Sequence, residues 1–253
     1  MSLIGKHCVI SGGSRGIGLA IARLFAAKGA GCTLIARDED RLTEAMKHLD
    51  RRHDSQQHDL SAFDVSAVNG WEALISRMKL QKTDILVNAA GISQNSFLFN
   101  TSNKTVDNLI ATNLIGTIWG CKYYIPKMMK QRDGCIINVS SLLATNGGRG
   151  ASVYAASKAG VVGLTRSLAW EVGRFGVRAN VLLPGYIRSD MTKGDLSPFL
   201  LDVDMDKNSE LSALIPMGRL GLAEEVAEAA LFLATSSYTH NCVLNIDGGL
   251  SAV

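Results

Sequence analysis

A run of glycines near the start of the chain follows directly on a short apolar segment. Residues 7–11 read His-Cys-Val-Ile-Ser, and residues 12–18 read Gly-Gly-Ser-Arg-Gly-Ile-Gly. The apolar run suits a buried strand, because glycines interrupt it at once. Gly12, Gly16 and Gly18 allow a tight turn and a close approach to a pyrophosphate, which the positive end of a following helix attracts. We expect that helix over residues 17–28 and a second strand over residues 32–36.

One glycine motif is a weak signal, but its place between a strand and a helix is typical of a dinucleotide-binding unit. The same alternation continues along the chain. We expect further helices over 40–49, 71–79, 105–131, 152–174 and 224–234, and strands over 85–87, 135–139, 177–182 and 243–246. Single strands separated by helices predict an α/β Rossmann fold with a doubly wound parallel sheet. The length suits one domain that spans residues 1–253.

Composition argues against several other classes of protein. The formal net charge is only +3 and no block of like charge stands in the chain, so neither nucleic acid nor a membrane surface is expected as the main partner. No run of about eighteen apolar residues predicts a membrane span. The five cysteines and five histidines lack metal-ligand spacing, and no metal is expected. The cysteines read as buried thiols of a reducing compartment, either the cytosol or the mitochondrial matrix.

Tyr154 and Lys158 stand four residues apart, and Ser141 precedes the tyrosine by thirteen residues. On a helix this spacing puts the phenol and the ammonium on one face. A phenol with a pKa of ~10 is a poor proton relay near neutrality unless a nearby cation stabilises its phenolate. A serine hydroxyl beside the phenol could hold a carbonyl oxygen while that oxygen is protonated. The alternative is that this pair of residues occurs on the helix by chance.

Together these motifs resemble the short-chain dehydrogenase/reductase family. The glycine spacing is followed, in the order that this family uses, by Asn88-Ala89-Ala90-Gly91, Asn113, Ser141, Tyr154, Lys158 and Pro184-Gly185. The likeness runs from Lys6 to Gly249. Such ordered agreement argues against a chance pairing of Tyr154 and Lys158.

The resemblance implies a role for each member of the catalytic group. Tyr154 would donate a proton, Lys158 would lower its pKa and bind the nicotinamide ribose, and Ser141 would orient the carbonyl. Ser140 is adjacent, but the family spacing selects Ser141. Asn113 would hold a water that passes protons to Lys158; taken alone, it could equally be a structural amide that bends a helix.

The resemblance also implies a nicotinamide dinucleotide at the carboxyl ends of the strands. The residues that would hold it are Gly12, Ser14, Arg15, Gly16, Ile17, Gly18, Arg37, Asp64, Val65, Asn88, Ala89, Ala90, Gly91, Tyr154, Lys158, Pro184, Gly185, Ile187 and Ser189.

The residue after the second strand decides between the two nicotinamide cofactors. Enzymes that choose NAD place an acidic residue there to bond the ribose hydroxyls. This chain has Arg37, whose guanidinium could fork onto a 2′-phosphate with help from Arg15, and NADPH is therefore expected. The alternative is that Arg37 pairs with Asp38 or Asp40 as a solvated surface residue.

Within the family the likeness is strongest to 3-oxoacyl-[acyl-carrier-protein] reductases and the related mitochondrial carbonyl reductase. It rests on the glycine segment and on residues 184–191 and 215–221. Arg132 stands where that group places a basic residue for the acidic carrier protein, whereas the second such position falls on Phe175, one residue after Arg174. The segment Ser93–Ser96 lacks the arginine usual there.

Three functions follow as hypotheses. The first is NADPH-dependent reduction of a 3-oxoacyl thioester to a 3-hydroxyacyl thioester, and the second is reduction of another ketone, quinone or polyol-derived carbonyl. The third is a non-enzymatic scaffold or nucleic-acid-binding subunit. The resemblance also implies a homotetramer. Residues 192–213 read either as a substrate lid or as a polar surface loop.

Overall fold

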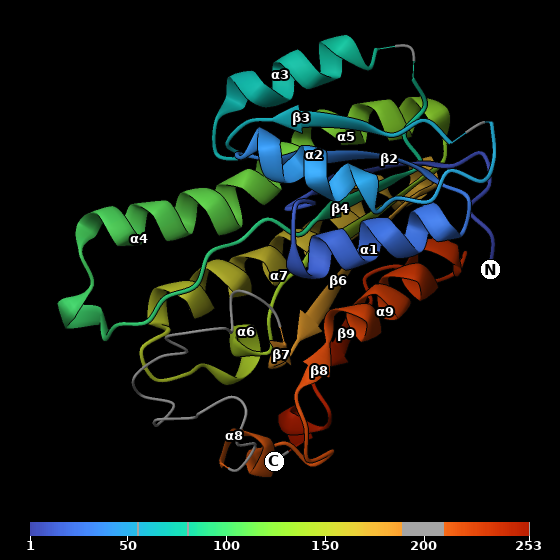
Figure 1. The fold of residues 1–253 in the computed structure, drawn as a ribbon. Helices are drawn as coiled ribbons and strands as arrows, with labels where there is room; N and C mark the ends of the chain where they lie inside the picture. Colours follow the sequence, from blue (N-terminus) through green and yellow to red (C-terminus); the bar gives the residue numbers. More distant parts are fainter. Residues whose placement is uncertain (55, 80, 189–209, 253) are drawn as a thin grey trace.

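The computed structural model describes residues 1–54, 56–79, 81–188 and 210–252. A seven-stranded parallel sheet in the order β3-β2-β1-β4-β5-β6-β9 forms its centre (Figure 1). The strands are β1 (His7–Ser11), β2 (Gly31–Ala36), β3 (Asp59–Ala62), β4 (Ile85–Asn88), β5 (Gly134–Val139), β6 (Val177–Pro184) and β9 (Val243–Ile246). The strand order reverses between β1 and β4, so the loops after these strands diverge and leave a crevice at the carboxyl edge. The predicted doubly wound α/β fold is confirmed.

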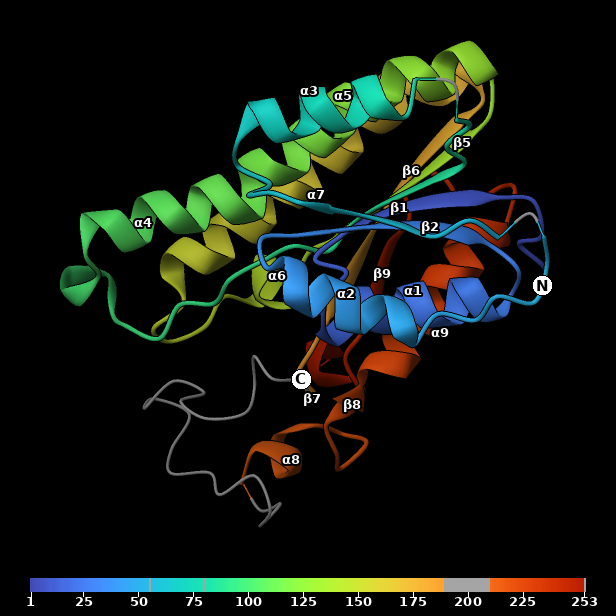
Figure 2. The ribbon, with the colours of Figure 1, turned by 45° about the horizontal axis from the view of Figure 1, so that its top comes forward.

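Helices cover both faces of the sheet, as Figure 2 shows. One face carries α1 (Gly16–Ala27), α2 (Glu39–Lys47) and α9 (Ala223–Thr235). The other carries α3 (Val68–Arg77), α5 (Gly116–Gln131) and α7 (Ser152–Val172). The short elements α4 (Asn103–Ile110), α6 (Leu143–Asn146), α8 (Glu210–Leu214) and the paired β7 (Ile187–Arg188) and β8 (Gly221–Leu222) lie around the carboxyl edge. This layering buries every central strand, which explains their continuous apolar runs.

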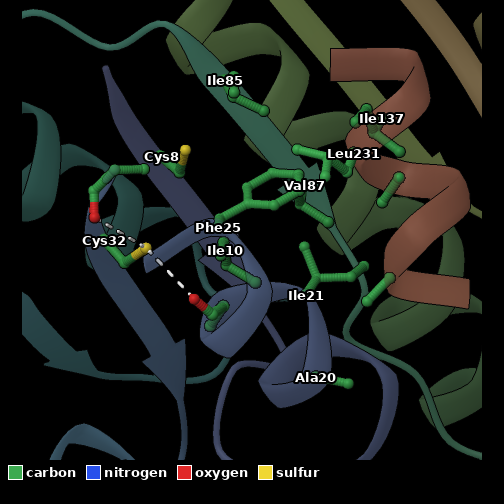
Figure 3. Close-up of a cluster of buried hydrophobic side chains, with 14 of the residues drawn as sticks. Cys8, Ile10, Ala20, Ile21, Phe25, Cys32, Ile85, Val87, Ile137 and Leu231 are labelled. Carbon is green, nitrogen blue, oxygen red and sulfur yellow. Dashed lines mark hydrogen bonds between the residues drawn. The ribbon is translucent and has the colours of Figure 1, made fainter. Parts of the chain in front are cut away.

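Each face of the sheet holds its own apolar layer. Figure 3 shows part of the layer under α1 and α9, where Ile10 and Val87 of the sheet meet Phe25 of α1 and Leu231 of α9. The layer on the opposite face is built around Trp71, which is fully buried. Because both layers end at the strand termini, the crevice above β1 and β4 rests on a rigid base.

The cysteines behave as expected with one exception. All five carry free thiols, and four of them are buried in the layers beside the sheet. Cys242 is only half-buried. It precedes β9, the last strand of the sheet. Among the described residues, β9 pairs with β6 on one side and with no strand on the other.

Two of the expected helices differ from their expected bounds in ways that the structure explains. The helix expected over 105–131 begins at Asn103, because the Ser102 hydroxyl accepts a hydrogen bond from the Thr105 amide (3.1 Å). A π-helical turn, Ala111–Ile115, then separates α4 from α5. The helix expected to reach residue 174 ends at Val172 and continues as a 3₁₀ turn, Gly173–Phe175.

Part of the expected lid lies outside the described residues. Of the segment 192–213, only residues 210–213 are described, and they belong to α8. Ser189 also falls outside the described part of the chain. Among the described residues, no helix combines the length and apolarity that crossing a bilayer demands.

Candidate active site

The glycine segment forms a close turn between β1 and α1. Gly12 and Gly16 have positive φ angles of 71° and 55°, a region that favours glycine. A Cβ atom on Gly12 would lie 2.7 Å from the carbonyl oxygen of Ala89, and one on Gly18 would overlap the carbonyl oxygen of Gly12. No side chain caps the start of α1, and its first turn holds no acidic residue. The turn therefore offers backbone N–H groups and the positive helix end to an anion.

A cleft of about 420 Å³ opens beside this turn. Most residues predicted to hold a dinucleotide line it: Gly12, Ser14, Arg15, Gly16, Ile17, Gly18, Arg37, Asp64, Val65, Ala89, Ala90 and Gly91. The sequence did not point to other lining residues, namely Ala36, Asp38, Arg41, Phe63, Ile92 and Thr112. The glycine turn leaves no space for side chains at the cleft floor, and this fits a pyrophosphate that approaches the backbone closely.

A basic group with one carboxylate occupies the end of the cleft beyond β2. Arg15, Arg37 and Arg41 all line it, together with Asp38. The Asp38 carboxylate accepts a hydrogen bond from the Arg41 amide (3.0 Å), which caps α2, and forms an ion pair with the Arg41 side chain (3.2 Å). In the described part of the chain, the ion-pair partner of Asp38 is therefore Arg41, not Arg37. Among the described residues, Arg37 forms an ion pair with neither Asp38 nor Asp40, the expected alternative.

The residues expected near the adenine and behind the nicotinamide lie at different depths. Asp64 lines the cleft, and its Oδ1 atom accepts from the amide and the hydroxyl of Ser66 (2.9 and 2.7 Å). Asn88 is buried behind the cleft wall, where its amide nitrogen donates to Asn138 Oδ1 (2.9 Å). Asn88 thus supports the wall formed by residues 89–91 and is absent from the cleft lining.

Lys158 lies two turns into α7 with only 4 % of its surface exposed. Its Nζ atom donates to the carbonyl oxygen of Val139 at the end of β5 (2.9 Å). Burial lowers the pKa of Lys158 from its ordinary 10.5 to about 8. A Cβ atom on Gly91 would lie 3.3 Å from this Nζ atom. The ammonium therefore sits directly behind the wall of the cleft.

Tyr154 lies in the first turn of α7, one turn before Lys158. The Ser141 side chain acts on the pKa of its phenol, and the Lys158 Nζ atom lies 5.9 Å from the centroid of its ring. Burial raises the pKa of Tyr154, and the hydrogen bond with Ser141 opposes that change. The lowering of this pKa that we expected from Lys158 does not show in this structure, because burial dominates; for the reacting enzyme it stays a prediction.

The two adjacent serines after β5 have different partners. The Ser140 hydroxyl is buried and donates to the carbonyl oxygen of Lys158 (2.7 Å), so it joins β5 to α7. The Ser141 hydroxyl accepts from the Leu143 amide (3.2 Å), and it opposes the rise in the pKa of Tyr154. Of the two, Ser141 is the one that acts on the Tyr154 pKa, whereas the Ser140 hydroxyl is taken up by the helix backbone; the catalytic role of Ser141 stays a prediction.

Asn113 sits in the π-helical turn and is fully buried. Its Oδ1 atom accepts from the Ile92 amide (2.9 Å), and its Nδ2 atom donates to the Ile92 carbonyl (3.0 Å) and to Ser157 Oγ (3.1 Å). The amide therefore ties the loop after β4 to α7, in agreement with the structural alternative. The water relay stays a prediction.

The end of β6 closes the site on the other side. The Pro184 carbonyl accepts from the Leu142 amide (2.9 Å), next to Ser141, and the Gly185 amide donates to Ile246 (2.9 Å). A Cβ atom on Gly185 would lie 2.8 Å from that of Asp247. Ile187 is buried in β7. Of these three predicted residues, Pro184 adjoins the loop of Ser141, and none of the three lines the 420 Å³ cleft.

Comparison with known proteins identifies the family to which this site belongs. The family model described as short chain dehydrogenase matches residues 6–197. Carbonyl reductase family member 4 of Xenopus laevis is 39% identical over 247 residues, which cover 97% of this chain and 98% of that protein. The 3-oxoacyl-[acyl-carrier-protein] reductase of Homo sapiens is 40% identical over 248 residues, covering 98% and 99%. The crystal structure of levodione reductase superimposes with a TM-score of 0.92 at 29% identity, covering 99% of each chain. The chain belongs to the short-chain dehydrogenase/reductase family of oxidoreductases.

Proposed function

We propose that the protein reduces a carbonyl compound to a secondary alcohol with NADPH. The observation that carries this proposal is the placement of Lys158 behind Gly91, at the wall of a cleft suited to a dinucleotide, with the Tyr154 ring 5.9 Å from its Nζ atom. When bound, NADPH would supply a hydride to the carbonyl carbon. The side chains behind the wall would supply the matching proton.

The proton path follows from the two pKa shifts. Tyr154 would protonate the carbonyl oxygen, while the Ser141 hydroxyl holds that oxygen beside the phenol. Burial raises the pKa of Tyr154 and lowers that of Lys158, so the ammonium becomes the stronger acid of the pair. Lys158 could then return a proton to the phenolate. Asn113 would position Ile92 and Ser157 around this path.

The cofactor proposal is supported by the basic end of the cleft. NADPH differs from NADH by a 2′-phosphate, which arginines bind as a fork. Arg15, Arg37 and Arg41 line that end. The only carboxylate of α2 that lines the cleft, Asp38, already caps the helix and pairs with Arg41. It is therefore poorly placed to bond ribose hydroxyls, as an NAD-selecting carboxylate must.

The proposed substrate is a 3-oxoacyl thioester, as the names of several relatives suggest. Arg132 and Arg174, the proposed contacts of a carrier protein, lie together, since Arg132 Nη2 donates to the Arg174 carbonyl (3.3 Å). They follow α5 and α7, whereas Tyr154 is in the first turn of α7, so a 21-residue helix about 30 Å long separates Arg174 from the phenol. A carrier protein bound there would serve the active site of another chain, in keeping with the proposed homotetramer.

A general carbonyl or quinone reductase is the second candidate. The distance between the arginine pair and Tyr154 favours it, because a small substrate needs no carrier contact. The name of the Xenopus laevis relative also agrees with it. For the compartment, we propose the cytosol or the mitochondrial matrix, where the five free thiols would stay reduced.

Initial rates of NADPH oxidation test the proposal. Acetoacetyl thioesters of carrier protein and of coenzyme A would be compared with a quinone and a sugar ketone. In Tyr154→Phe, turnover should fall at least about a hundredfold while NADPH still binds, because only the transferable proton is lost. Near-normal turnover of a folded Tyr154→Phe protein would remove this residue from the mechanism.

A further inference from the structure

The helix that carries Tyr154 and Lys158 begins without a cap of its own. The residue before its first turn is Ala151, which has no side-chain oxygen and makes no capping hydrogen bond. The Ala155 amide donates to the carbonyl oxygen of Ala151, just before α7 (2.7 Å). The amides of Val153 and Tyr154 therefore need an acceptor from elsewhere.

Gln94 supplies that acceptor from a loop that is distant in sequence. Its Oε1 atom accepts from the amides of Val153 (2.8 Å) and Tyr154 (3.0 Å). These are the second and third positions of the helix, which a capping side chain usually serves. Gln94 is only 5 % exposed, so water does not replace these bonds easily.

The other end of the Gln94 amide is also bonded. Its Nε2 atom donates to the Ser96 carbonyl (2.9 Å) and to the Thr101 hydroxyl (3.1 Å). The Ser96 amide in turn donates to the Gly150 carbonyl (3.2 Å), just before α7. The loop after β4 thus rests on the turn that precedes the helix, and the bonds at both ends of the amide fix its orientation.

We propose that Gln94 is a positioning residue, which caps α7 from outside and thereby holds the Tyr154 phenol at Ser141. Helix ends fray first, and Tyr154 stands in the first turn of α7, whereas Lys158 is anchored further along by Val139. A misplacement of about 1 Å at a reacting group can slow a reaction by roughly a hundredfold. The catalytic part of this inference rests on the proposed reductase function; the capping part does not.

Three variants separate capping from loop support. Gln94→Met keeps the length of the side chain but offers no oxygen to α7. Gln94→Glu keeps an acceptor oxygen for Val153 and Tyr154. Thr101→Val removes a partner of the Gln94 Nε2 atom and leaves the cap intact, so it is the matched control. Circular dichroism would establish that each variant is folded.

Amide hydrogen exchange gives a readout that does not depend on activity. In Gln94→Met the amides of Val153 and Tyr154 should exchange about tenfold faster than in the unaltered protein, because their acceptor is lost. In Gln94→Glu and Thr101→Val they should exchange nearly as slowly as in the unaltered protein. Unchanged exchange in Gln94→Met would overturn the capping inference, whether or not the protein reduces any carbonyl tested.

Steady-state kinetics tests the positioning role. In Gln94→Met the kcat for a carbonyl substrate should fall about tenfold with the Kd for NADPH unchanged, and Gln94→Glu should restore most of it. A merely structural role predicts lower thermal stability with the kcat of the folded enzyme unchanged, and that result would overturn the proposal. Equal losses of kcat in Thr101→Val and Gln94→Met would overturn it as well, since loop support would then explain both.

Discussion

Replacing Lys158 by methionine should make the protein more stable at neutral pH although it removes a residue of the proposed active site. The buried ammonium has a pKa of about 8 against an ordinary 10.5, which corresponds to a penalty of about 3 kcal/mol at pH 7. Methionine removes this penalty. It also removes the hydrogen bond to the buried Val139 carbonyl, at a cost of about 1 kcal/mol. The net gain in the free energy of unfolding should be about 2 kcal/mol.

The same reasoning predicts how this gain depends on pH. Below pH 8 Lys158 is charged in both states and the full penalty applies. Between pH 8 and 10.5 the folded protein loses this proton while the unfolded chain keeps it, so the unaltered protein gains stability as pH rises. Near pH 10.5 the penalty for burying the Lys158 ammonium has largely gone. Lys158→Met should then be slightly less stable than the unaltered protein, because its Val139 carbonyl has lost the lysine donor.

Urea denaturation at pH 7 and near pH 10 would measure these differences, with Lys104→Met, an exposed position on α4, as the control. Lys104→Met should change neither the stability nor its pH dependence. A Lys158→Met protein that is less stable at pH 7, with a deficit independent of pH, would refute the reasoning. It would show that the ammonium is stabilised by partners other than Val139.

The remaining predictions concern the cofactor and the substrate. Arg37→Asp should reduce the preference for NADPH over NADH about a hundredfold, or ~3 kcal/mol, because a phosphate contact becomes a like charge; titration of both cofactors measures it, and equal affinity of the unaltered protein for the two contradicts it. Gly18→Ala should weaken NADPH binding at least about tenfold, because its Cβ would overlap the Gly12 carbonyl. In the control, Gly163→Ala, the added Cβ meets nothing within 4 Å. This control should leave NADPH binding unchanged and stabilise α7 by ~1 kcal/mol. Reversing both Arg132 and Arg174 to glutamate should slow reduction of a carrier-bound thioester, and this loss of rate should shrink as salt rises. The rate with a small free thioester should stay unchanged. No loss with either substrate favours the general carbonyl reductase.

The fold could be predicted because its signals are local. Strand β1 has the expected bounds, His7–Ser11, since a buried parallel strand reads as a continuous apolar run between polar residues and glycines. The two-residue strands β7 and β8 escaped prediction, because so short a pair leaves no periodic pattern. The π-helical turn around Asn113 escaped it too. That turn depends on the Asn113 amide meeting Ile92 and Ser157, which no local pattern encodes.

Part of the predicted site depends on spacing along one helix alone. The four-residue interval puts Tyr154 and Lys158 on one face of α7, and the Ser140 hydroxyl bonds the Lys158 carbonyl whereas Ser141 acts on the pKa of Tyr154. Arg41 gave no signal, because its role depends on which carboxylate caps α2. Gln94 gave none either, since its contact with the Tyr154 amide spans 60 residues of sequence.

Buried amides at the end of β4 and in the segment after it connect to successive points of α7. Gln94 bonds the helix at Val153 and Tyr154, and Asn113 links Ile92 to Ser157. Further along, Asn88 bonds Asn138, whose Nδ2 atom donates to the Thr165 hydroxyl (2.9 Å).

Because bonds at two levels hold α7 to the loop after β4, and a third link runs from the end of β4 through β5, the cleft wall at residues 89–92 and the helix that carries Tyr154 should move as a single body. In the proposed reaction, a hydride arrives from the side of that wall and a proton from the helix, and both must reach one carbonyl group together. Such a reaction requires that the distance between the hydride donor and the proton donor be held to within about 1 Å. The amide bonds therefore fix the distance on which the proposed chemistry depends, although none of these three amides need touch the substrate.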